Sequence, residues 1–410
     1  MVQIQSKKRN IVVKTKEAFL GCFLFTCLLL LWISQRVMKL SSPPILDVPN
    51  SDDTKVTATT SNRLLPLFVV HVGPPKTGTT SLQHAIEQYN SMLIEDNYYF
   101  TGNSSFTDHF NICVRRVRKA NLDFTIECWK RILDTMESHR ALGHNVILSN
   151  EVISVQAQFS DFRQVIESLL SNWKPNVLIV VGYRHLHNFF PSTHYELQKN
   201  QRWPSVEEKG KYVTPFVKFW RDNHGKYVLG PIPTPSLVIS QFRSFNYSVS
   251  VLDIETKEQI TEFFCNILPQ ASQTCKYITR VPPQIPKLNE NNKGLVNYDS
   301  LAILAFTRRY LKKEQTRKYL RYKIQAFNEK ILNHGPNDFV LSCLDHHEEK
   351  IFLEESMEHA RLAGFSHLEN KIEMDFMRSR AKKKFCSINA SVVFYQEEWQ
   401  NFFRKAKTEW

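Results

Sequence analysis

The chain has 410 residues, 42% of them hydrophobic and 12% aromatic, so most of it can bury a core and is not intrinsically disordered. This length allows one large domain or two of ordinary size. Lys and Arg outnumber Asp and Glu by 53 to 40, a net charge of +13. Such a surplus favours anionic partners and carries no information about the fold. Phosphate, sulfate, nucleic acid and acidic lipid all agree with charge alone.

The first distinctive segment is an apolar run over residues 18–34, which contains no charged side chain. At about 1.5 Å per residue, a helix of this length just spans the hydrocarbon layer of a membrane. A cleaved signal peptide is the alternative, but no small-x-small cleavage pattern follows the run. Cations are concentrated in residues 1–17. The positive-inside rule therefore predicts a cytoplasmic tail, a transmembrane signal anchor over 18–34, and a luminal or extracellular remainder.

The segment after the anchor differs in composition from the rest of the chain. Residues 35–63 contain many Ser, Thr, Asp, Asn and Pro and few large apolar side chains. Such a stretch cannot bury enough surface to order itself, so we expect a luminal stem. The folded catalytic domain is then predicted to cover residues 64–410.

Cysteines and glycosylation sequons agree with a luminal domain. Six cysteines follow the anchor, an even number in a compartment that permits disulfides. Cys265 and Cys275 are the pair that we expect to be joined, because they flank the end of a predicted helix within one short loop. The other four, Cys113, Cys128, Cys343 and Cys386, cannot be paired from the sequence. N-glycosylation sequons begin at Asn103, Asn246 and Asn389.

The first element of the folded region contains the most informative motif. Residues 67–72 are apolar and rich in β-branched side chains, which is typical of a central parallel strand covered on both faces. They lead directly into Gly73-Pro-Pro-Lys-Thr-Gly-Thr-Thr-Ser81, and residues 82–89 then have helical spacing. A strand, a Gly-containing loop and a helix together surround a phosphate with backbone N–H groups. The motif predicts an anion-binding loop.

Two details separate this loop from that of a nucleotide hydrolase. The spacing from Gly73 to Gly78 fits the P-loop, but Thr79 stands where that motif requires Lys, and the cation is Lys76 instead. The apolar run 177–183 ends in Arg184, not in an Asp that could hold Mg²⁺. The pattern favours a metal-free, strongly cationic phosphate site.

Residues 75–81, Pro-Lys-Thr-Gly-Thr-Thr-Ser, resemble the 5′-phosphosulfate loop of sulfotransferases that use 3′-phosphoadenylyl sulfate (PAPS). In that superfamily a second strand ends in Arg, and a Ser eight residues later helps it to hold the 3′-phosphate. Arg184 and Ser192 have this spacing. The resemblance covers roughly residues 67–280 and fades towards the C-terminus. It implies a three-layer α/β fold of the P-loop type with a central parallel sheet, preceded by one transmembrane helix.

The resemblance also implies a donor site without a metal. Lys76 would stabilise the charge that grows on the leaving 5′-phosphate. Two positions depart from the family's second motif, because Leu186 and Phe189 replace a Pro and a second Arg. We therefore expect this motif to make fewer contacts to the 3′-phosphate, or other parts of the chain to contribute to binding it. The residues implied to bind PAPS are Lys76, Thr77, Gly78, Thr79, Thr80, Ser81, Arg184, Ser192 and, from a short match to a late basic loop, Lys293.

The acceptor is expected to be a hydroxyl, which needs a base to take its proton. Glu151 follows the apolar strand 145–150 and should lie at the carboxyl edge of the sheet. Glu95 lies beyond the first helix, where glycosaminoglycan-type relatives often place a catalytic Glu. His109 lies in a polar loop that could line the acceptor cleft, as a His does in other branches. Glu151 is the preferred candidate, and the other two stay open.

Together these features predict a single-pass type II membrane protein of the Golgi that transfers a sulfuryl group from PAPS to a hydroxyl of a glycan or glycosaminoglycan. Nucleic acid is not expected as a partner, and a homodimer is left open. Three alternatives remain. They are tyrosyl residues of secreted proteins as the acceptor, a P-loop nucleotide phosphotransferase, and a glycan-binding homologue without turnover.

Later elements are expected to extend the α/β pattern. Residues 247–253 alternate as a strand, and a helix with Thr256 as its cap should follow to Cys265. The cation-rich segment 299–332 is predicted to be one long helix, with either a solvated face or a cationic rim for an anionic glycan. Residues 346–349, His-His-Glu-Glu, lack metal-ligand spacing and are expected to cap or solvate a helix.

Overall fold

A computed structural model describes residues 65–102, 113, 122–156, 167, 170–171, 173–174, 176–199, 215–281, 301–302, 305–306, 308–311, 317–331 and 341–409. The chain from Leu64 to Trp410 forms one compact unit. The predicted tail, anchor and stem lie outside the described residues, as do His109 and Lys293. Within the described ranges, no helix is both long enough and apolar enough to cross a membrane.

A parallel sheet of five strands lies at the centre of this unit, in the order β2-β3-β1-β4-β7. Every residue of β1 is buried, and nearly every residue of β3 and β4 is. Such uniform burial is expected where helices cover both faces of a parallel sheet. The strands are β1 (Phe68–Val72), β2 (Tyr98–Phe100), β3 (Asn145–Ser149), β4 (Val177–Tyr183) and β7 (Ser248–Asp253). The predicted α/β class with a central parallel sheet is confirmed.

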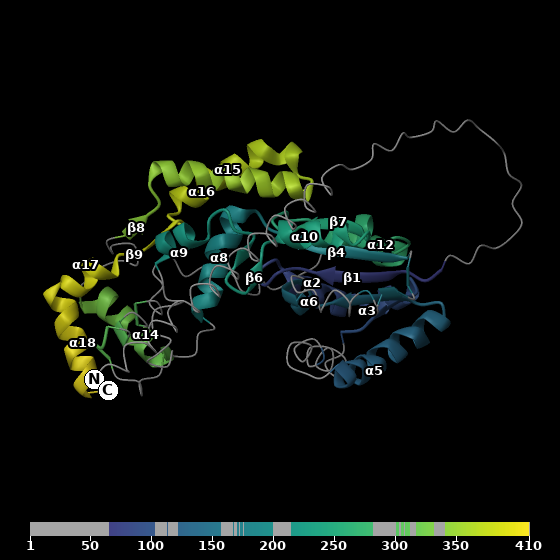
Figure 1. Ribbon diagram of the computed structural model, residues 1–410, viewed down its shortest axis with the longest axis horizontal. Coiled ribbons are helices and arrows are strands. Elements are labelled where there is room, and N and C mark those ends of the chain that lie inside the picture. The colour runs from purple at the N-terminus through teal and green to yellow at the C-terminus, as the bar shows by residue number, and fades with distance from the viewer. Residues whose placement is uncertain are drawn as a thin grey trace, which may run out of the picture. The chain divides into compact units, whose positions relative to one another are not determined.

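Helices cover both faces of the sheet, as can be followed in Figure 1. Because side chains alternate along a strand, Val69 packs on one face and its neighbours Phe68 and Val70 pack on the other. The Val69 face is covered by α2 (Thr79–Gln88), α3 (Asn90–Glu95), α11 (Gln259–Thr261), the π-helix η1 (Glu262–Ile267) and α12 (Ser272–Arg280). The opposite face is covered by α5 (Leu122–Ala141), α6 (Glu151–Gln156) and α10 (Pro235–Ser244).

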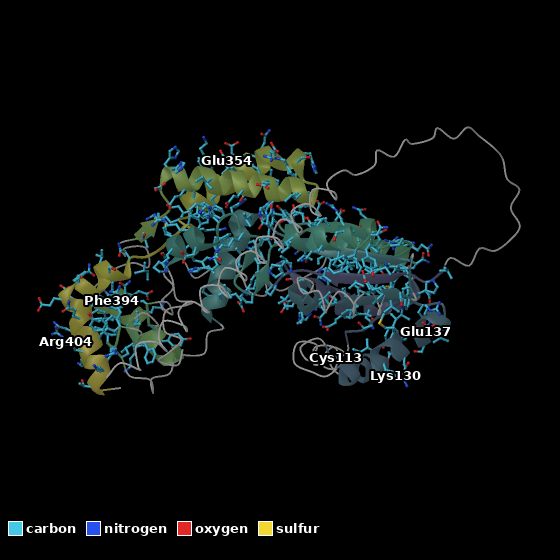
Figure 2. The ribbon with its side chains drawn as sticks, viewed as in Figure 1. Cys113, Lys130, Glu137, Glu354, Phe394 and Arg404 are labelled. Atoms are coloured by element: carbon cyan, nitrogen blue, oxygen red, sulfur yellow. A yellow bond between two sulfur atoms is a disulfide. The ribbon has the colours of Figure 1, made fainter. Side chains whose placement is uncertain are left out.

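Two further apolar clusters involve the second half of the chain. One joins α8 (Leu186–Lys199) and α9 (Phe216–Asn223) to α15 (His346–Ala363) and α16 (Glu369–Ala381). The other joins α14 (Arg317–Ala326) and the π-helix η2 (Phe327–Ile331) to α17 (Ala390–Tyr395) and α18 (Glu397–Glu409), where Figure 2 labels Phe394. The short elements are β5 (Val228–Leu229), β6 (Ile232–Pro233), β8 (Leu341–Cys343), β9 (Cys386–Ile388) and the 3-10 helix η3 (Ser366–Leu368).

Disulfides join elements at two places. Cys265 and Cys275 are bonded, which confirms the predicted pair. Cys343 and Cys386 are bonded as well, and they lie directly opposite each other in the antiparallel pair of β8 and β9. These two cysteines are 43 residues apart in sequence, so only the pairing of the strands brings them together. Cys113 also belongs to a disulfide.

Two helix predictions were wrong in detail. The helix after β7 begins at Gln259, because the Thr256 hydroxyl donates to the Asp253 carbonyl at 3.1 Å and closes a turn instead of capping a helix. The pattern over 299–332 is not one continuous helix, because residues 308–311 form a turn in which Arg309 has a φ of 65°. A left-handed residue of this kind does not continue a right-handed helix. The prediction for residues 346–349 is confirmed, since Asp345 and Glu348 form a capping box at the start of α15.

Buried histidines are expected to make the folded domain sensitive to acid. Burial lowers the pKa of His359 from 6.5 to about 4, and its Nδ1 lies 2.5 Å from Ser236 Oγ. The unfolded chain takes up a proton near pH 6.5 and the folded domain does not, so this contribution to stability is complete above pH 6.5 and is lost as the pH falls towards 4. Because of His359, the free energy of unfolding should fall by about 1 kcal/mol between pH 7 and pH 5.5.

Denaturant unfolding of the full chain at both pH values tests this expectation. His359→Gln should reduce the acid-induced loss. Equal losses in the wild type and in His359→Gln would contradict the assignment.

Candidate functional site

The topology of the sheet brings two loops together at its carboxyl edge. The chain after β1 leads to β2 on one side, whereas the chain after β4 leads to β7 on the other side. β1 and β4 are neighbours in the sheet, with Val72 opposite Val181. The direction in which the chain proceeds across the sheet therefore changes between β1 and β4. Open α/β sheets bind ligands at the carboxyl ends of the two strands where this change occurs. The predicted anion loop follows β1, and Arg184 follows β4.

The loop after β1 holds Lys76 in a backbone conformation that lysine rarely adopts. Lys76 has a φ of 78°, the value needed at the third position of a type II turn. The turn is closed by the Thr77 N–H, which donates to the Pro74 carbonyl at 3.2 Å, and Pro75 stands at its second position. The Thr77 hydroxyl donates to the same carbonyl at 2.7 Å. Glycine usually takes this place because a Cβ costs about 1 kcal/mol there. Strain of this kind is concentrated at functional sites.

The helix that follows the loop offers hydrogen-bond donors. Gly78 precedes α2 in a left-handed conformation, with a φ of 73°, and no side chain caps the helix. The first backbone N–H groups of the helix, from Thr79, Thr80 and Ser81, have no partner within it. Among the described contacts, the buried Thr79 hydroxyl also has no hydrogen-bond partner. This end of the helix can therefore bind an anion.

Two carboxylates accompany the Lys76 ammonium group. Lys76 Nζ lies 2.7 Å from Glu196 Oε2, and each side chain is about 15% exposed. Glu151 is the first residue of α6, directly after β3, which pairs with β1. The residue as a whole is exposed, yet burial of its carboxyl group raises the pKa of Glu151, while the charge of Lys76 lowers this pKa and that of Glu196 raises it. The charges of both members of the ion pair therefore act on Glu151.

Sequence reasoning missed Glu196. It lies on α8 four residues after Ser192, so both residues share a face of the helix. That spacing is the signal that could have identified it.

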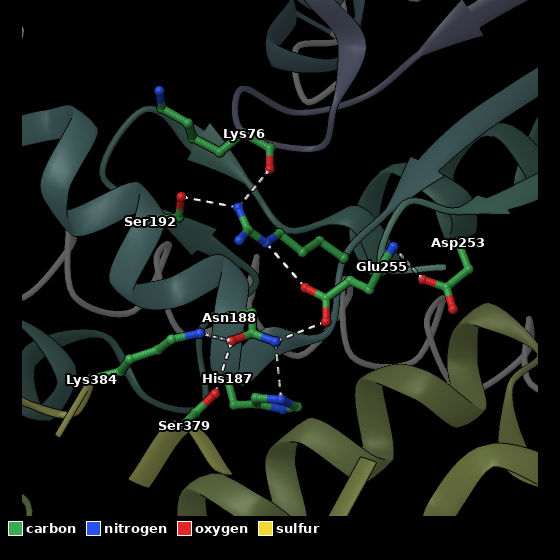
Figure 3. A network of polar contacts seen from close by, with 9 residues as sticks. Lys76, His187, Asn188, Ser192, Asp253, Glu255, Ser379 and Lys384 are labelled. Carbon is green, nitrogen blue, oxygen red and sulfur yellow. Dashed lines mark hydrogen bonds and ion pairs between the residues drawn. The ribbon is translucent and has the colours of Figure 1, made fainter. Parts of the chain in front are cut away.

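Arg184 joins the two predicted motifs directly. Its Nη1 donates to the Lys76 carbonyl at 3.2 Å and to Ser192 Oγ at 3.0 Å. Figure 3 draws both contacts as dashed lines and labels the two partners, Lys76 and Ser192. Its Nε donates to Glu255 Oε1 at 3.1 Å. The side chain is 28% exposed, so a ligand can still reach it. The guanidinium group is held from three sides in one orientation.

Glu255 was also missed from the sequence. It lies just beyond β7, at the same carboxyl edge as Arg184, and its backbone N–H donates to Asp253 Oδ1 at 2.9 Å. Its second carboxylate oxygen accepts from Asn188 Nδ2 at 2.7 Å. The carboxylate therefore orients Arg184 and balances part of the positive charge of the site.

Gly182 in β4 allows the loop to pack against the sheet. A Cβ at this position would lie 2.9 Å from the Thr77 carbonyl oxygen and 3.2 Å from Thr77 Oγ1. Because the closest atom belongs to the backbone, Gly182→Ala is expected to displace the loop and to lower the free energy of unfolding by about 1–3 kcal/mol. Binding of inorganic phosphate to the loop, measured by calorimetry, should weaken as well. Val249→Ala, in β7, serves as a control that loses core packing without touching the loop. Unchanged binding in Gly182→Ala would contradict this role.

The structure does not bring every predicted site residue to this place. Glu95 is exposed at the end of α3, just before β2, so it lies at the amino edge of the sheet, opposite Lys76. Its neighbour Asp96 accepts hydrogen bonds from the backbone N–H groups of Gln273 and Thr274 and so caps α12. His109 and Lys293 lie outside the described residues.

The residues that depart from the family's second motif are part of the core. Leu186 is 3% exposed and Phe189 is 0% exposed, both within the cluster around α8. His185 and His187 are fully buried with stacked rings, which agrees with a structural role.

Neither a metal group nor a relative adds to this description. In the described part of the chain, no group of three or more His, Cys, Asp or Glu side chains is placed to hold a metal ion. Comparison of the chain with protein-family models, curated proteins and solved structures finds no match.

Proposed function

We propose that this protein is a PAPS-dependent sulfotransferase with a P-loop-type fold, anchored in the Golgi membrane, which sulfates a hydroxyl of a glycan or glycosaminoglycan. One observation supports this most strongly. The guanidinium group of Arg184 bonds to the backbone of Lys76 and to the side chain of Ser192, so the two predicted donor motifs form one site.

The residues present fit the two ends of the donor. The loop N–H groups, Lys76 and the Thr79 hydroxyl, which has no hydrogen-bond partner among the described residues, would hold the 5′-phosphosulfate. Arg184 and Ser192 would hold the 3′-phosphate. Nine of the 13 net positive charges lie beyond residue 17, which suits a donor with several negative charges.

The transfer step follows from these positions. Glu151 accepts the proton of the acceptor hydroxyl while the oxygen of that hydroxyl forms a bond to the sulfur. The bond between the sulfur and the bridging oxygen breaks, and its electron pair stays on the 5′-phosphate. Lys76 and the loop N–H groups stabilise that charge, so the products are a sulfate ester and adenosine 3′,5′-bisphosphate. Before the donor binds, the ammonium group of Lys76 is held by Glu196.

A glycan is the favoured acceptor because the predicted anchor, stem and sequons would put the site in the secretory lumen, where glycans are abundant.

The decisive experiment uses the purified full chain in detergent with ³⁵S-labelled PAPS. Separate reactions contain neutral glycans, glycosaminoglycans and tyrosine-containing peptides. A labelled glycan or glycosaminoglycan is the expected product. A labelled peptide would show that the acceptor is tyrosine and not a glycan. Donor binding without any product would favour the glycan-binding alternative. Mg²⁺-dependent phosphate transfer from labelled ATP, with no reaction of PAPS, would refute the proposal in favour of a phosphotransferase.

A further inference from the structure

A second cation lies close to Arg184, although it comes from a distant part of the chain. Lys384 Nζ donates to Asn188 Oδ1 at 3.1 Å. The other end of that amide, Asn188 Nδ2, donates to Glu255 Oε2 at 2.7 Å, and Glu255 Oε1 accepts from Arg184 Nε at 3.1 Å. Figure 3 shows this chain of contacts. One amide and one carboxylate therefore connect the ammonium group to the guanidinium group.

The positive charge of this pair is only partly balanced. Among the described residues, Glu255 forms an ion pair with Arg184, whereas Lys384 contacts the neutral amide of Asn188 and forms no ion pair. Burial of the ammonium group lowers the pKa of Lys384, and the charge of Arg184 lowers it further. The charges of Glu255 and Asp375 act on this pKa in the opposite direction. Asp375 itself pairs with Arg378 at 2.9 Å, so Glu255 is left to balance both Arg184 and Lys384, and a bound anion would neutralise the excess positive charge.

The position of Lys384 is set in advance by its neighbours. Its backbone N–H donates to the Ser379 carbonyl at 3.0 Å, and Lys383 has a φ of 52°, which turns the chain at the end of α16. Phe385 is only 1% exposed within the apolar cluster that joins α8 and α9 to α15 and α16, and Cys386 is bonded to β8 by a disulfide. The residue as a whole remains exposed, although its ammonium group is partly buried where it contacts Asn188. A fixed backbone reduces the entropy lost when the side chain binds an anion.

We propose that Lys384 binds the 3′-phosphate of the donor together with Arg184 and Ser192, and so makes the site select nucleotides that carry this phosphate. This inference rests on the proposed function. It supplies a cation that the second motif lacks at Phe189, which is buried in the core. The C-terminal part of the chain would thereby complete the donor site that the first half begins.

Calorimetric titration of the full chain tests the inference with two probes, adenosine 3′,5′-bisphosphate and adenosine 5′-monophosphate. Lys384→Gln keeps a donor for the Asn188 oxygen but removes the charge. It should weaken binding of the bisphosphate about tenfold and change binding of the monophosphate less than twofold. Lys384→Arg should restore most of the affinity. Lys382→Gln, an exposed lysine of the same turn, is the matched control and should behave like the wild type.

The outcomes separate this inference from the proposed function. If Lys384→Gln weakens both probes equally, or neither, Lys384 has only a structural role and the inference is overturned while the proposed function stands. If the wild-type chain fails to bind the bisphosphate, both are overturned. The expected pattern, a loss confined to the probe with the 3′-phosphate, supports both.

Discussion

Lys76→Ala is expected to lower the rate of sulfuryl transfer by about 10³-fold, equivalent to about 4 kcal/mol of transition-state stabilisation. The ammonium group is the cation of the loop, and in the proposed reaction the departing 5′-phosphate gains negative charge beside it. Affinity for adenosine 3′,5′-bisphosphate should fall much less, because the loop N–H groups and Arg184 remain. The measurement is kcat with ³⁵S-labelled PAPS and a saturating acceptor, alongside the dissociation constant of the bisphosphate.

A second substitution at the same position separates charge from backbone strain. Lys76 has a φ of 78°, so Lys76→Gly should raise the free energy of unfolding by about 1 kcal/mol relative to Lys76→Ala while transfer stays equally low. Lys218→Ala is the control, because Lys218 also pairs with a carboxylate, at 3.0 Å from Asp222, but lies on α9. Turnover near the wild-type value in Lys76→Ala would refute the assignment of this residue.

Glu151→Gln is expected to lower kcat by about 10²–10⁴-fold while leaving donor affinity nearly unchanged. An amide keeps the size and polarity of the side chain but cannot accept the proton of the acceptor hydroxyl. The wild-type rate should rise with pH as Glu151 loses its proton, and the raised pKa of this residue places that rise above its ordinary value of 4.5. In Glu151→Gln the acidic limb of the pH profile should disappear.

The rival candidates for the base provide the controls. Glu95→Gln should retain full activity, because Glu95 lies at the opposite edge of the sheet. Glu196→Gln should keep the acidic limb, although loss of the ion pair with Lys76 will change the rate. If His109→Gln loses turnover and Glu151→Gln does not, the base is His109 and the role of Glu151 is refuted.

Much of the fold could be predicted because the signals were local. The run 177–183 is apolar at almost every position, and it forms β4 with the predicted bounds. The run 67–72 forms β1 with one residue fewer. Predictions failed where a local pattern competes with a turn. The spacing from Thr256 is helical, but its hydroxyl closes a turn after β7. The cations of residues 299–332 fit one long helix, but the chain turns at Arg309.

The candidate site divides in the same way. The predicted anion loop with Lys76 and the spacing from Arg184 to Ser192 can be recognised in the sequence, because backbone donors and fixed cations must follow a strand at short range. The carboxylates and cations that face them became apparent in the folded domain. Glu196, Glu255 and Lys384 come from separate elements, and the order of the strands and the packing of α8 against α16 bring them together. Contacts between groups so far apart in sequence leave no local pattern, since they depend on how whole elements pack.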